Sequence, residues 1–394
     1  MMKTGMFSVN EIVAGMMESN KMNLQSLNRK QRKLICDMMI CHQPQAGFSK
    51  SKCSNPECSH HEIHYGSCNN LGCPSCGALK KEEWVDAQKE KVINAFYYHI
   101  IFTVPDKALN RLFMHDPEFM YNALFDAQAQ ALKKLSRDPR YFGVEKTGFM
   151  STIHTWGSAM TYHNHIHTVF CGSGLDQNGK LIEKKTKFLF PAKVAAKVFK
   201  GEFLHIVCGK YEKSDSPWLA DLQEAKAAEW NVEIRRPSNN PERVIEYLGR
   251  YVNRIAISNG RITGYADGRV TFNYKDYRDH GRIKSMTLED TEFIRRFLMH
   301  VLPENFVRIR YYGFMSSGGA QTLELMKKLT HTPRTFRRRS KAEILRSLNN
   351  GNFMRCPKCG FELNTVCYQP RRQRGSRIHS VQKAASERGP ISSG

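Results

Sequence analysis

The stretch "TYHNHIHTVF", residues 161–170, places His163, His165 and His167 at every second position. Successive side chains of a β-strand point to opposite faces, so residues two apart share a face. The stretch therefore predicts a strand that carries three imidazoles on one side. Neutral imidazoles are frequent ligands of divalent ions. The alternative is a polar strand face at the edge of a sheet, and the histidines alone leave that alternative open.

Basic residues outnumber acidic ones, because 60 Lys and Arg against 37 Asp and Glu give a net charge of +23 over 394 residues. Such an excess favours a polyanionic partner, usually nucleic acid and sometimes an anionic membrane. No apolar run reaches the roughly 18 residues that span a bilayer. The N-terminal stretch, which carries Glu11 and Glu18, lacks the pattern of a signal peptide. We expect a cytoplasmic protein whose cysteines are not in disulfides.

Most of the cysteines gather in two parts of the chain, seven between residues 36 and 76 and three between 356 and 367. Cys53 and Cys58 form one close pair, and Cys73 and Cys76 form a second pair in "CPSC". Two such pairs about fifteen residues apart are typical of a structural tetrahedral zinc site. We therefore expect these four cysteines to bind zinc. Six further residues could serve as ligands nearby: Cys36, Cys41, Cys68, His60, His61 and His64.

The C-terminal cysteines resemble half of a zinc ribbon. Cys356 and Cys359 form the pair, with Cys367 as a third candidate ligand and no obvious fourth. Whether zinc binds there is left open by the sequence. The basic stretch before them, "PRTFRRRSKAEILR", contains Arg337, Arg338 and Arg339, which we expect to contact nucleic acid.

A helix is predicted over about residues 241–254, because Asn240 is a good N-cap and Pro241 suits the first helical position. On this helix Tyr247 and Tyr251 are four residues apart and share a face. Three arginines lie on the same helix: Arg243, Arg250 and Arg254. A divalent ion on the histidines could polarise a phosphodiester, arginines could hold its oxygens, and a tyrosine could attack it. The alternative is that both tyrosines are ordinary core residues.

These motifs together resemble a known family. "HNHIHTVF" is similar to the His-hydrophobe-His motif of the HUH endonuclease superfamily. "EYLGRYVNRIAIS" and "FIRRFLMHVLPENFVRIRYYG" resemble the rolling-circle transposases of two-tyrosine insertion sequences, and "CPSC" resembles their N-terminal zinc-binding domain. The resemblance covers about residues 30 to 360. The chain departs from the pattern in its wide first cysteine pair and in the residue at Asn253.

The resemblance implies an α+β fold, with an antiparallel ferredoxin-like or palm-like sheet and flanking helices. His165 and His167 would lie on a central strand and bind one Mg²⁺ or Mn²⁺. Tyr247 or Tyr251 would cut one DNA strand, leaving a 5′-phosphotyrosine and a free 3′-OH. The partners would be single-stranded and terminal hairpin DNA of the mobile element and target DNA, near the nucleoid of a prokaryote. For the third metal ligand we favour His163; the rivals are His154, Glu246 and Asn253.

We expect four regions: an N-terminal helical and zinc-binding domain at residues 1–92, a catalytic domain at 93–315, a basic C-terminal region with the cysteine knuckle at 316–370, and a disordered basic tail at 371–394. The leading hypothesis is a transposase for its own insertion sequence. A rolling-circle replication initiator or a relaxase would use the same chemistry. A non-catalytic zinc-dependent DNA-binding protein would explain the cysteines and the basic charge, but it would leave the histidines and tyrosines without a role.

Overall fold

The computed structural model describes residues 7–371, except for 185, 187, 239–244, 247–248, 250–254 and 334–335. The predicted tail from residue 372 onward therefore lies outside the described residues. Arg371, at the end of the described chain, donates a hydrogen bond of 2.9 Å to the buried Asp37.

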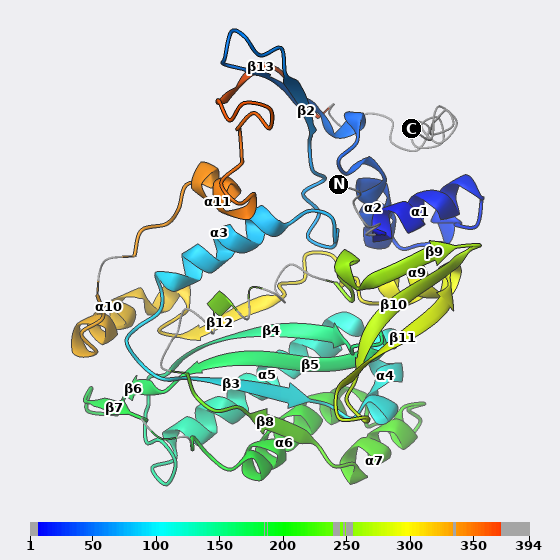
Figure 1. Ribbon diagram of the computed structural model, residues 1–394. Coiled ribbons are helices and arrows are strands. Elements are labelled where there is room, and N and C mark those ends of the chain that lie inside the picture. The colour runs from blue at the N-terminus through cyan, green and yellow to red at the C-terminus, as the bar shows by residue number, and fades with distance from the viewer. Residues whose placement is uncertain are drawn as a thin grey trace.

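A five-stranded sheet forms the centre of the molecule (Figure 1). Every neighbouring pair of its strands is antiparallel. Across the sheet the order is β12 (Ile309–Gly313), β4 (Gly148–Trp156), β5 (Tyr162–Cys171), β3 (Tyr97–Thr103) and β8 (Asn231–Ile234). The α+β class with an antiparallel sheet is thereby confirmed, and the histidine-bearing strand β5 is the middle strand.

Helices cover one face of this sheet, the lower face in Figure 1. The apolar residues that face them alternate along the strands, as in Ile100 and Phe102 on β3 and Ile166 and Phe170 on β5. The covering helices are α4 (Asp106–His115), α5 (Pro117–Arg137), α6 (Ala192–Tyr211) and α7 (Leu219–Ala227). This layer is the largest apolar core of the described chain, and it buries the side of β5 opposite to the histidines.

The histidine face of the sheet is closed at one end by a smaller apolar cluster. Met150 of β4 and Val169 of β5 pack there with Val85 of α3 (Ala78–Lys89) and with Ile245. Figure 1 shows α3 on the opposite side of the sheet from α5 and α6. The histidines therefore lie on the face of the sheet that is turned toward α3 and away from the covering helices.

The N-terminal helices do not form a core of their own. Val9 and Ile12 of α1 and Ile35 of α2 share one apolar cluster with Phe272 of β10 and Phe293 of α9. The elements of this unit are α1 (Val9–Glu18), α2 (Arg29–Ile40), β9 (Ile262–Ala266), β10 (Arg269–Asp276), β11 (Arg282–Glu289) and α9 (Asp290–Met299). The predicted boundary between residues 92 and 93 therefore does not separate two independent cores.

The hairpin between β9 and β10 turns at Asp267 and Gly268. Asp267 and Gly268 both have positive φ, 50° and 71°, which a tight hairpin turn requires. Val270 and Phe272 of β10 then point into the shared core. A residue without this freedom at Gly268 would strain the turn that positions them.

The C-terminal region returns to the N-terminal part of the chain. β13 (Leu363–Gln369) pairs antiparallel with β1 (Phe48–Cys53), which also pairs with β2 (His61–Tyr65). The predicted region 316–370 is therefore split, because its last strand completes an N-terminal sheet. The remaining elements are β6 (Ser173–Leu175), β7 (Leu181–Glu183), α10 (Ala320–Leu329), α11 (Lys341–Leu348) and the 3-10 turns η1 (Leu24–Ser26), η2 (Pro44–Ala46), η3 (Asn259–Arg261) and η4 (Ser317–Gly319).

Within the described ranges, no helix combines the length and the apolar character needed to cross a membrane.

Candidate metal centres

Three histidines from two neighbouring strands converge on the open face of the sheet. His165 and His167 lie on β5, and His154 lies directly opposite His165 on β4. The three can each offer one ring nitrogen such that these nitrogens all lie within 4.8 Å of one another. Residues that face each other across antiparallel strands are only about 5 Å apart at Cβ, which is why a partner on β4 comes so close.

Hydrogen bonds set which ring nitrogen of each histidine is available. The Nδ1 of His165 lies 2.9 Å from the carbonyl oxygen of His163. A carbonyl can only accept, so this Nδ1 carries the proton and the Nε2 keeps its lone pair. The Nδ1 of His167 lies 2.8 Å from the Nε2 of His99. If His167 uses Nε2 as a metal ligand, its Nδ1 donates to His99, an arrangement common around metal-binding histidines.

Burial keeps these imidazoles neutral. It lowers the pKa of His165 to about 3, with a further lowering by His163. Burial also holds the pKa values of His154 and His167 well below the ordinary range, and neighbouring histidines add to both effects. A divalent ion binds neutral imidazole, so at pH 7 the cluster has the protonation state that a metal requires. The donor set therefore fits a divalent cation.

His163, which we favoured as the third ligand, is not part of this cluster. Its Nδ1 lies 2.6 Å from a carboxylate oxygen of Asp106 at the start of α4. Its position shares the face of His165 and His167, but a strand rises about 3.3 Å per residue and carries it away from His167. His154, one of the rivals, is the residue that the strand pairing brings into reach.

Sequence reasoning missed several groups beside the histidines. His99 stacks on His167 with a centroid distance of 5.0 Å. Thr152 pairs with His167 across the strands, and its buried hydroxyl has no hydrogen-bond partner among the described residues. The charges of Arg308 and Arg235 act on the cluster, since Arg308 lowers the pKa of His154 and Arg235 that of His167. Strand alternation in "YYHIIFTVP" could have identified His99, whereas the arginines depend on tertiary contacts.

Both predicted nucleophiles and three predicted DNA contacts lie outside the described residues: Tyr247, Tyr251, Arg243, Arg250 and Arg254. Asn253, a rival for the third ligand, lies there too. Of their described neighbours, Ile245 packs against the histidine-bearing face, in the cluster with Met150 and Val169. Glu246, another rival, instead accepts a hydrogen bond of 2.8 Å from Lys89 of α3. A Cβ added to Gly249 would lie 2.6 Å from the side chain of Val85, so a larger residue here would force one of the two to shift.

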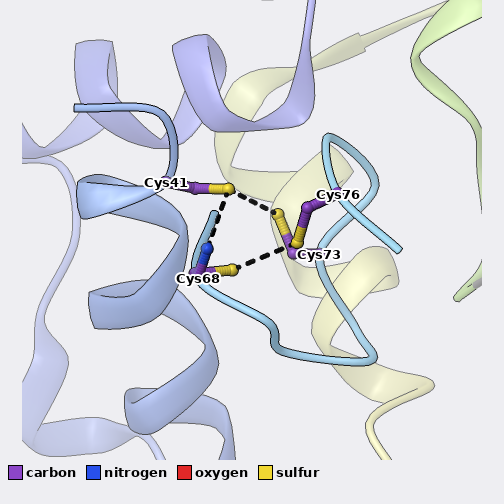
Figure 2. Close-up of side chains that lie close together, drawn as sticks. All are labelled: Cys41, Cys68, Cys73 and Cys76. Carbon is purple, nitrogen blue, oxygen red and sulfur yellow. Dashed lines mark hydrogen bonds between the residues drawn. The ribbon is translucent and has the colours of Figure 1, made fainter. Parts of the chain in front are cut away.

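The first cysteine cluster joins α2 to the "CPSC" loop. Cys41 follows α2 directly, and its sulfur meets those of Cys68, Cys73 and Cys76 (Figure 2). The distance is 3.8 Å between the sulfurs of Cys41 and Cys73, and 3.4 Å between those of Cys68 and Cys76. A tetrahedron with Zn–S bonds of about 2.3 Å would separate sulfurs by about 3.8 Å. The four cysteines therefore fit a closed, structural zinc site.

The second cluster joins residues from opposite parts of the chain. The sulfurs of four cysteines lie within 4.8 Å of one another: Cys53, Cys58, Cys356 and Cys359. The sulfur of Cys53 lies 3.4 Å from that of Cys359, and the sulfur of Cys58 lies 3.8 Å from that of Cys356. Cys367, the third ligand that the sequence suggested, is exposed on β13 and pairs with Lys50 instead.

The predicted single site of Cys53, Cys58, Cys73 and Cys76 is therefore wrong, although all four residues lie in cysteine clusters. The structure divides them between two clusters of four. The reason is that strand β1 ends at Cys53, next to β13, while the "CPSC" loop packs against the end of α2. Spacing along the chain identifies such cysteine pairs, but it cannot show which pairs meet in space.

The three C-terminal arginines are described, and each forms an ion pair. Arg337 pairs with Glu343, and Arg338 with Glu90. Arg339 is held more firmly, because its guanidinium binds both carboxylate oxygens of Asp86, at 2.8 and 2.9 Å. The pairs of Arg338 and Arg339 attach the segment before α11 to the region of α3, whereas Arg337 pairs within its own segment and α11. DNA binding by these arginines stays a prediction.

Comparison with known proteins agrees with these centres. Residues 12–104, which contain the whole first cysteine cluster, match a family described as "Transposase zinc-binding domain" of the IS91 type. Residues 148–322, which contain the histidine cluster, match a family described as "Putative transposase". Together with the antiparallel sheet, these matches define a zinc-binding transposase.

Two curated proteins are similar over most of their lengths. The "Putative transposase y4qJ" of Sinorhizobium fredii is 33% identical, over 85% of this chain and 88% of the relative. The "Transposase for insertion sequence element IS801" of Pseudomonas savastanoi pv. phaseolicola is 24% identical, over 83% of this chain and 81% of the relative. No solved structure matches the chain significantly. The chain therefore belongs to the IS91 family of rolling-circle, two-tyrosine insertion-sequence transposases, as its motifs predicted.

Proposed function

We propose that this transposase nicks and rejoins single DNA strands through a 5′-phosphotyrosine at the histidine cluster. The observation that carries this proposal is the convergence of His154, His165 and His167, whose ligand nitrogens lie within 4.8 Å of one another on the face of a central sheet. These imidazoles, two buried and one half-buried, are suited as neutral ligands to one divalent cation. Mg²⁺ or Mn²⁺ bound there would polarise the scissile phosphodiester.

Other residues around the cluster would orient the histidine rings, supply positive charge and transfer protons. His99 and the carbonyl of His163 orient the rings of His167 and His165, so each ring keeps one tautomer. Arg308 and Arg235 supply positive charge beside the cluster, which favours a phosphate in this position. His163 and Asp106, hydrogen-bonded at the edge of the site, can pass a proton to or from a reacting oxygen.

The nucleophiles in this proposal are Tyr247 and Tyr251. The tyrosine oxygen attacks phosphorus and loses its proton, and the bond from phosphorus to the 3′ oxygen breaks. The 5′ end stays attached to the tyrosine, and the 3′ oxygen takes up a proton to become the free hydroxyl. Reversal of these steps joins strands without a nucleotide cofactor, because the phosphodiester energy is kept in the phosphotyrosine. A second tyrosine allows a second cleavage while the first end is still held.

The DNA partners in this proposal are single strands and terminal hairpins of the element, together with target DNA. The net charge of +23 supports a polyanionic substrate. Arg243, Arg250 and Arg254 are the predicted contacts near the tyrosines. Arg337 and Arg338 are further candidates, since each pairs with a partly exposed carboxylate.

The alternatives are less well supported. A replication initiator or relaxase would share the histidine chemistry, but the matched relatives are named transposases and cover more than four fifths of the chain. A purely DNA-binding protein would need zinc and basic charge, and it would have no use for three histidines that converge on a common face.

The test is the formation of a covalent protein–DNA adduct. Purified protein is incubated with single-stranded DNA from the end of its element and Mn²⁺, and the adduct is detected in denaturing gels. We expect the adduct with the natural chain and with His205→Ala, an exposed histidine on α6 that serves as a matched control. We expect none with His165→Ala, or with Tyr247→Phe and Tyr251→Phe combined. An adduct in the double tyrosine variant would refute the assigned nucleophiles.

A further inference from the structure

The two C-terminal residues of the second cysteine cluster lie outside both segments that match known families. Cys356 and Cys359 follow residue 322, where the transposase match ends, and Cys53 and Cys58 lie inside the zinc-binding match. The pairs are separated by about 300 positions of sequence, since Cys58 and Cys356 are 298 residues apart. Nothing in the "CPKC" spacing alone reveals this partnership.

Both cysteine pairs sit in turns that backbone hydrogen bonds define. The N–H of Asn55 donates to the sulfur of Cys53 at 3.4 Å. The N–H of Gly360 donates to the carbonyl of Cys356 at 2.8 Å, and Gly360 has a φ of 76°. Such turns aim the two sulfurs of each pair toward the same point, and amide donors beside the sulfurs stabilise thiolates.

The sheet beside this cluster has little apolar core to hold it. Among the described residues, the apolar cluster there contains only three buried members, Cys53, Cys356 and Leu363. Large side chains on the strands are exposed instead, among them Tyr368 at 72% and Val366 at 59%. A small unit with so little burial needs a cross-link or a metal to be stable.

We infer that Cys53, Cys58, Cys356 and Cys359 bind a second structural Zn²⁺, which clips the C-terminal segment onto the N-terminal sheet. Sulfur separations of 3.4 and 3.8 Å match a zinc tetrathiolate and exceed the S–S length of about 2.05 Å in a disulfide. Four thiolates leave no open position, so this zinc takes no part in strand transfer. Its role is to hold β13 against β1 and thereby to keep α11 and the arginines before it beside α3.

The experiment measures zinc per chain in the full-length protein. We expect two zinc ions in the natural chain, one after Cys356→Ser combined with Cys359→Ser, and two after Cys367→Ser. Cys367 is the matched control because it is a cysteine of the same segment outside both clusters. Hydrogen exchange supplies a second readout, since amides of β1 and β13 should lose protection in the double variant only.

Three outcomes would overturn the second site. These are one zinc in the natural chain, two zinc ions in the double variant, or a mass about 4 Da lower under non-reducing denaturation, which would mean two disulfides. If the double variant does not fold, cobalt replacement of zinc in the natural chain gives the answer. Two equivalents should produce tetrathiolate absorption, and saturation at one equivalent would contradict the proposal.

A second, independent observation concerns a basic groove between the N-terminal helices and the central sheet. Its volume is about 1030 Å³. α2, the loop before α3 and the segment leading into β12 line it. One of its lining residues is acidic, Glu304. Six are cationic: Arg29, Lys30, Arg32, Lys33, Lys80 and Arg308.

The groove lies on the same face of the sheet as the histidine cluster, at the edge that β12 forms. Ile309 of β12 lines it and pairs with Thr152 of β4, which in turn pairs with His167. These three residues therefore share the face of the sheet that carries the histidines. The charge of Arg308 lowers the pKa of Lys30 in the groove as well as that of His154 in the cluster, although burial is the larger cause for both.

The geometry points to a binding site for single-stranded DNA, in which the groove leads a strand to the histidines; this inference rests on the proposed function. Exposed Leu71 and Val307 and half-buried Trp84 lie among the cations. Unpaired bases stack on such apolar and aromatic surfaces while their phosphates contact Lys and Arg. A duplex hides its bases and would not use these surfaces.

The test compares DNA affinity of two charge-removing variants by fluorescence anisotropy with a labelled oligothymidine. Arg29→Gln combined with Lys80→Gln changes the groove. Lys193→Gln combined with Lys197→Gln removes two exposed cations from α6, on the other side of the sheet. We expect a Kd at least tenfold higher for the groove variant, and a slope of log K against log salt smaller by about 1.4, for two phosphate contacts. The control variant should bind more weakly by less than threefold.

The formation of a covalent adduct tests the cleavage proposal separately from the proposal that the groove binds single-stranded DNA. An equal loss of DNA affinity in both variants, or tighter binding to duplex than to single strands, would refute DNA binding by the groove. If the natural chain binds through the groove but never forms an adduct, the binding proposal is supported and the cleavage proposal is refuted. If adducts form while the groove variant binds DNA normally, the cleavage proposal is supported and the binding proposal is refuted.

Discussion

At the scale of single residues, hydrogen bonding distinguishes the candidate metal ligands from the histidines beside them. The Nδ1–H of His165 donates to the carbonyl oxygen of His163, and the Nδ1 of His167 is hydrogen-bonded to His99. His163 has its Nδ1 on the carboxylate of Asp106 and lies outside the cluster. Three histidines on one strand face thus differ in role because their partners differ.

We predict that His154→Ala weakens Mn²⁺ binding at the histidine cluster at least tenfold, while His163→Ala changes it less than threefold. His154 offers a ligand atom within the cluster, whereas His163 offers none. Isothermal titration with Mn²⁺ measures both affinities, after zinc content has been shown to be unchanged. A larger loss in His163→Ala than in His154→Ala would return the third-ligand role to His163.

Strand alternation was enough to predict which face the histidines share, because alternation is a local property of extended chain. The third ligand was not predictable in this way. It depends on the register between β4 and β5, which places His154 opposite His165. The same limit explains the cysteines, since Cys41 and Cys356 join their clusters through tertiary packing. Burial of charges such as Arg308 is also set by tertiary structure.

At the scale of elements, ion pairs fasten the C-terminal segment to α3. Arg339 binds both oxygens of Asp86, whose side chain is only 3% exposed, and also contacts Glu82. Burial raises the pKa of Asp86, but hydrogen bonds and charge from Arg339 outweigh it, so the pKa lies below its ordinary value. A carboxylate held in this way stabilises the fold only while it is ionised.

We predict that Arg339→Ala lowers the free energy of unfolding at pH 7 by about 2 kcal/mol, because Asp86 is left buried without its partner. Because the folded pKa of Asp86 is depressed, the contribution is complete above its unfolded pKa of about 3.9 and is lost as pH falls below it. The difference between natural and variant chains should therefore shrink below about pH 4. Chemical denaturation at pH 7 and pH 3.5 measures this, with Arg337→Ala, an exposed arginine, as the control.

A glycine on the segment beside α3 offers another element-scale prediction. A Cβ at Gly249 would lie 2.6 Å from the Val85 side chain, so Gly249→Val must displace α3 or the segment itself. We expect a loss of about 2 kcal/mol in unfolding free energy and loss of DNA cleavage. Gly201→Val, at a helical glycine with open space around it, is the control. Normal cleavage by Gly249→Val would show that this close packing is not required for activity.

At the scale of the whole molecule, the parts that sequence divides into domains are held together by shared cores and shared cysteine clusters. α1 and α2 complete a core with β10 and α9, and β13 completes a sheet with β1. The segments in between carry the central sheet and the histidines. We therefore expect zinc binding, folding and the geometry of the histidine cluster to be coupled in this chain.

This coupling can be tested with one buried isoleucine far from the histidines in sequence. Ile12 of α1 is fully buried in the core that it shares with Phe272 and Phe293. We predict that Ile12→Ala lowers the free energy of unfolding by about 3 kcal/mol, because it removes buried methyl groups and leaves a cavity. Ile63→Ala makes the same change at a side chain that is 48% exposed and should cost less than about 0.5 kcal/mol.

The measurement is urea denaturation followed by tryptophan fluorescence and by hydrogen exchange in α1 and α9. Trp156 packs beside the shared core and reports on its loss. If the core is common, α1 and α9 lose protection together and by the same free energy in Ile12→Ala. If α1 instead opens in a separate, earlier transition while α9 keeps its natural stability, the N-terminal helices are an independent domain, as the sequence alone suggested.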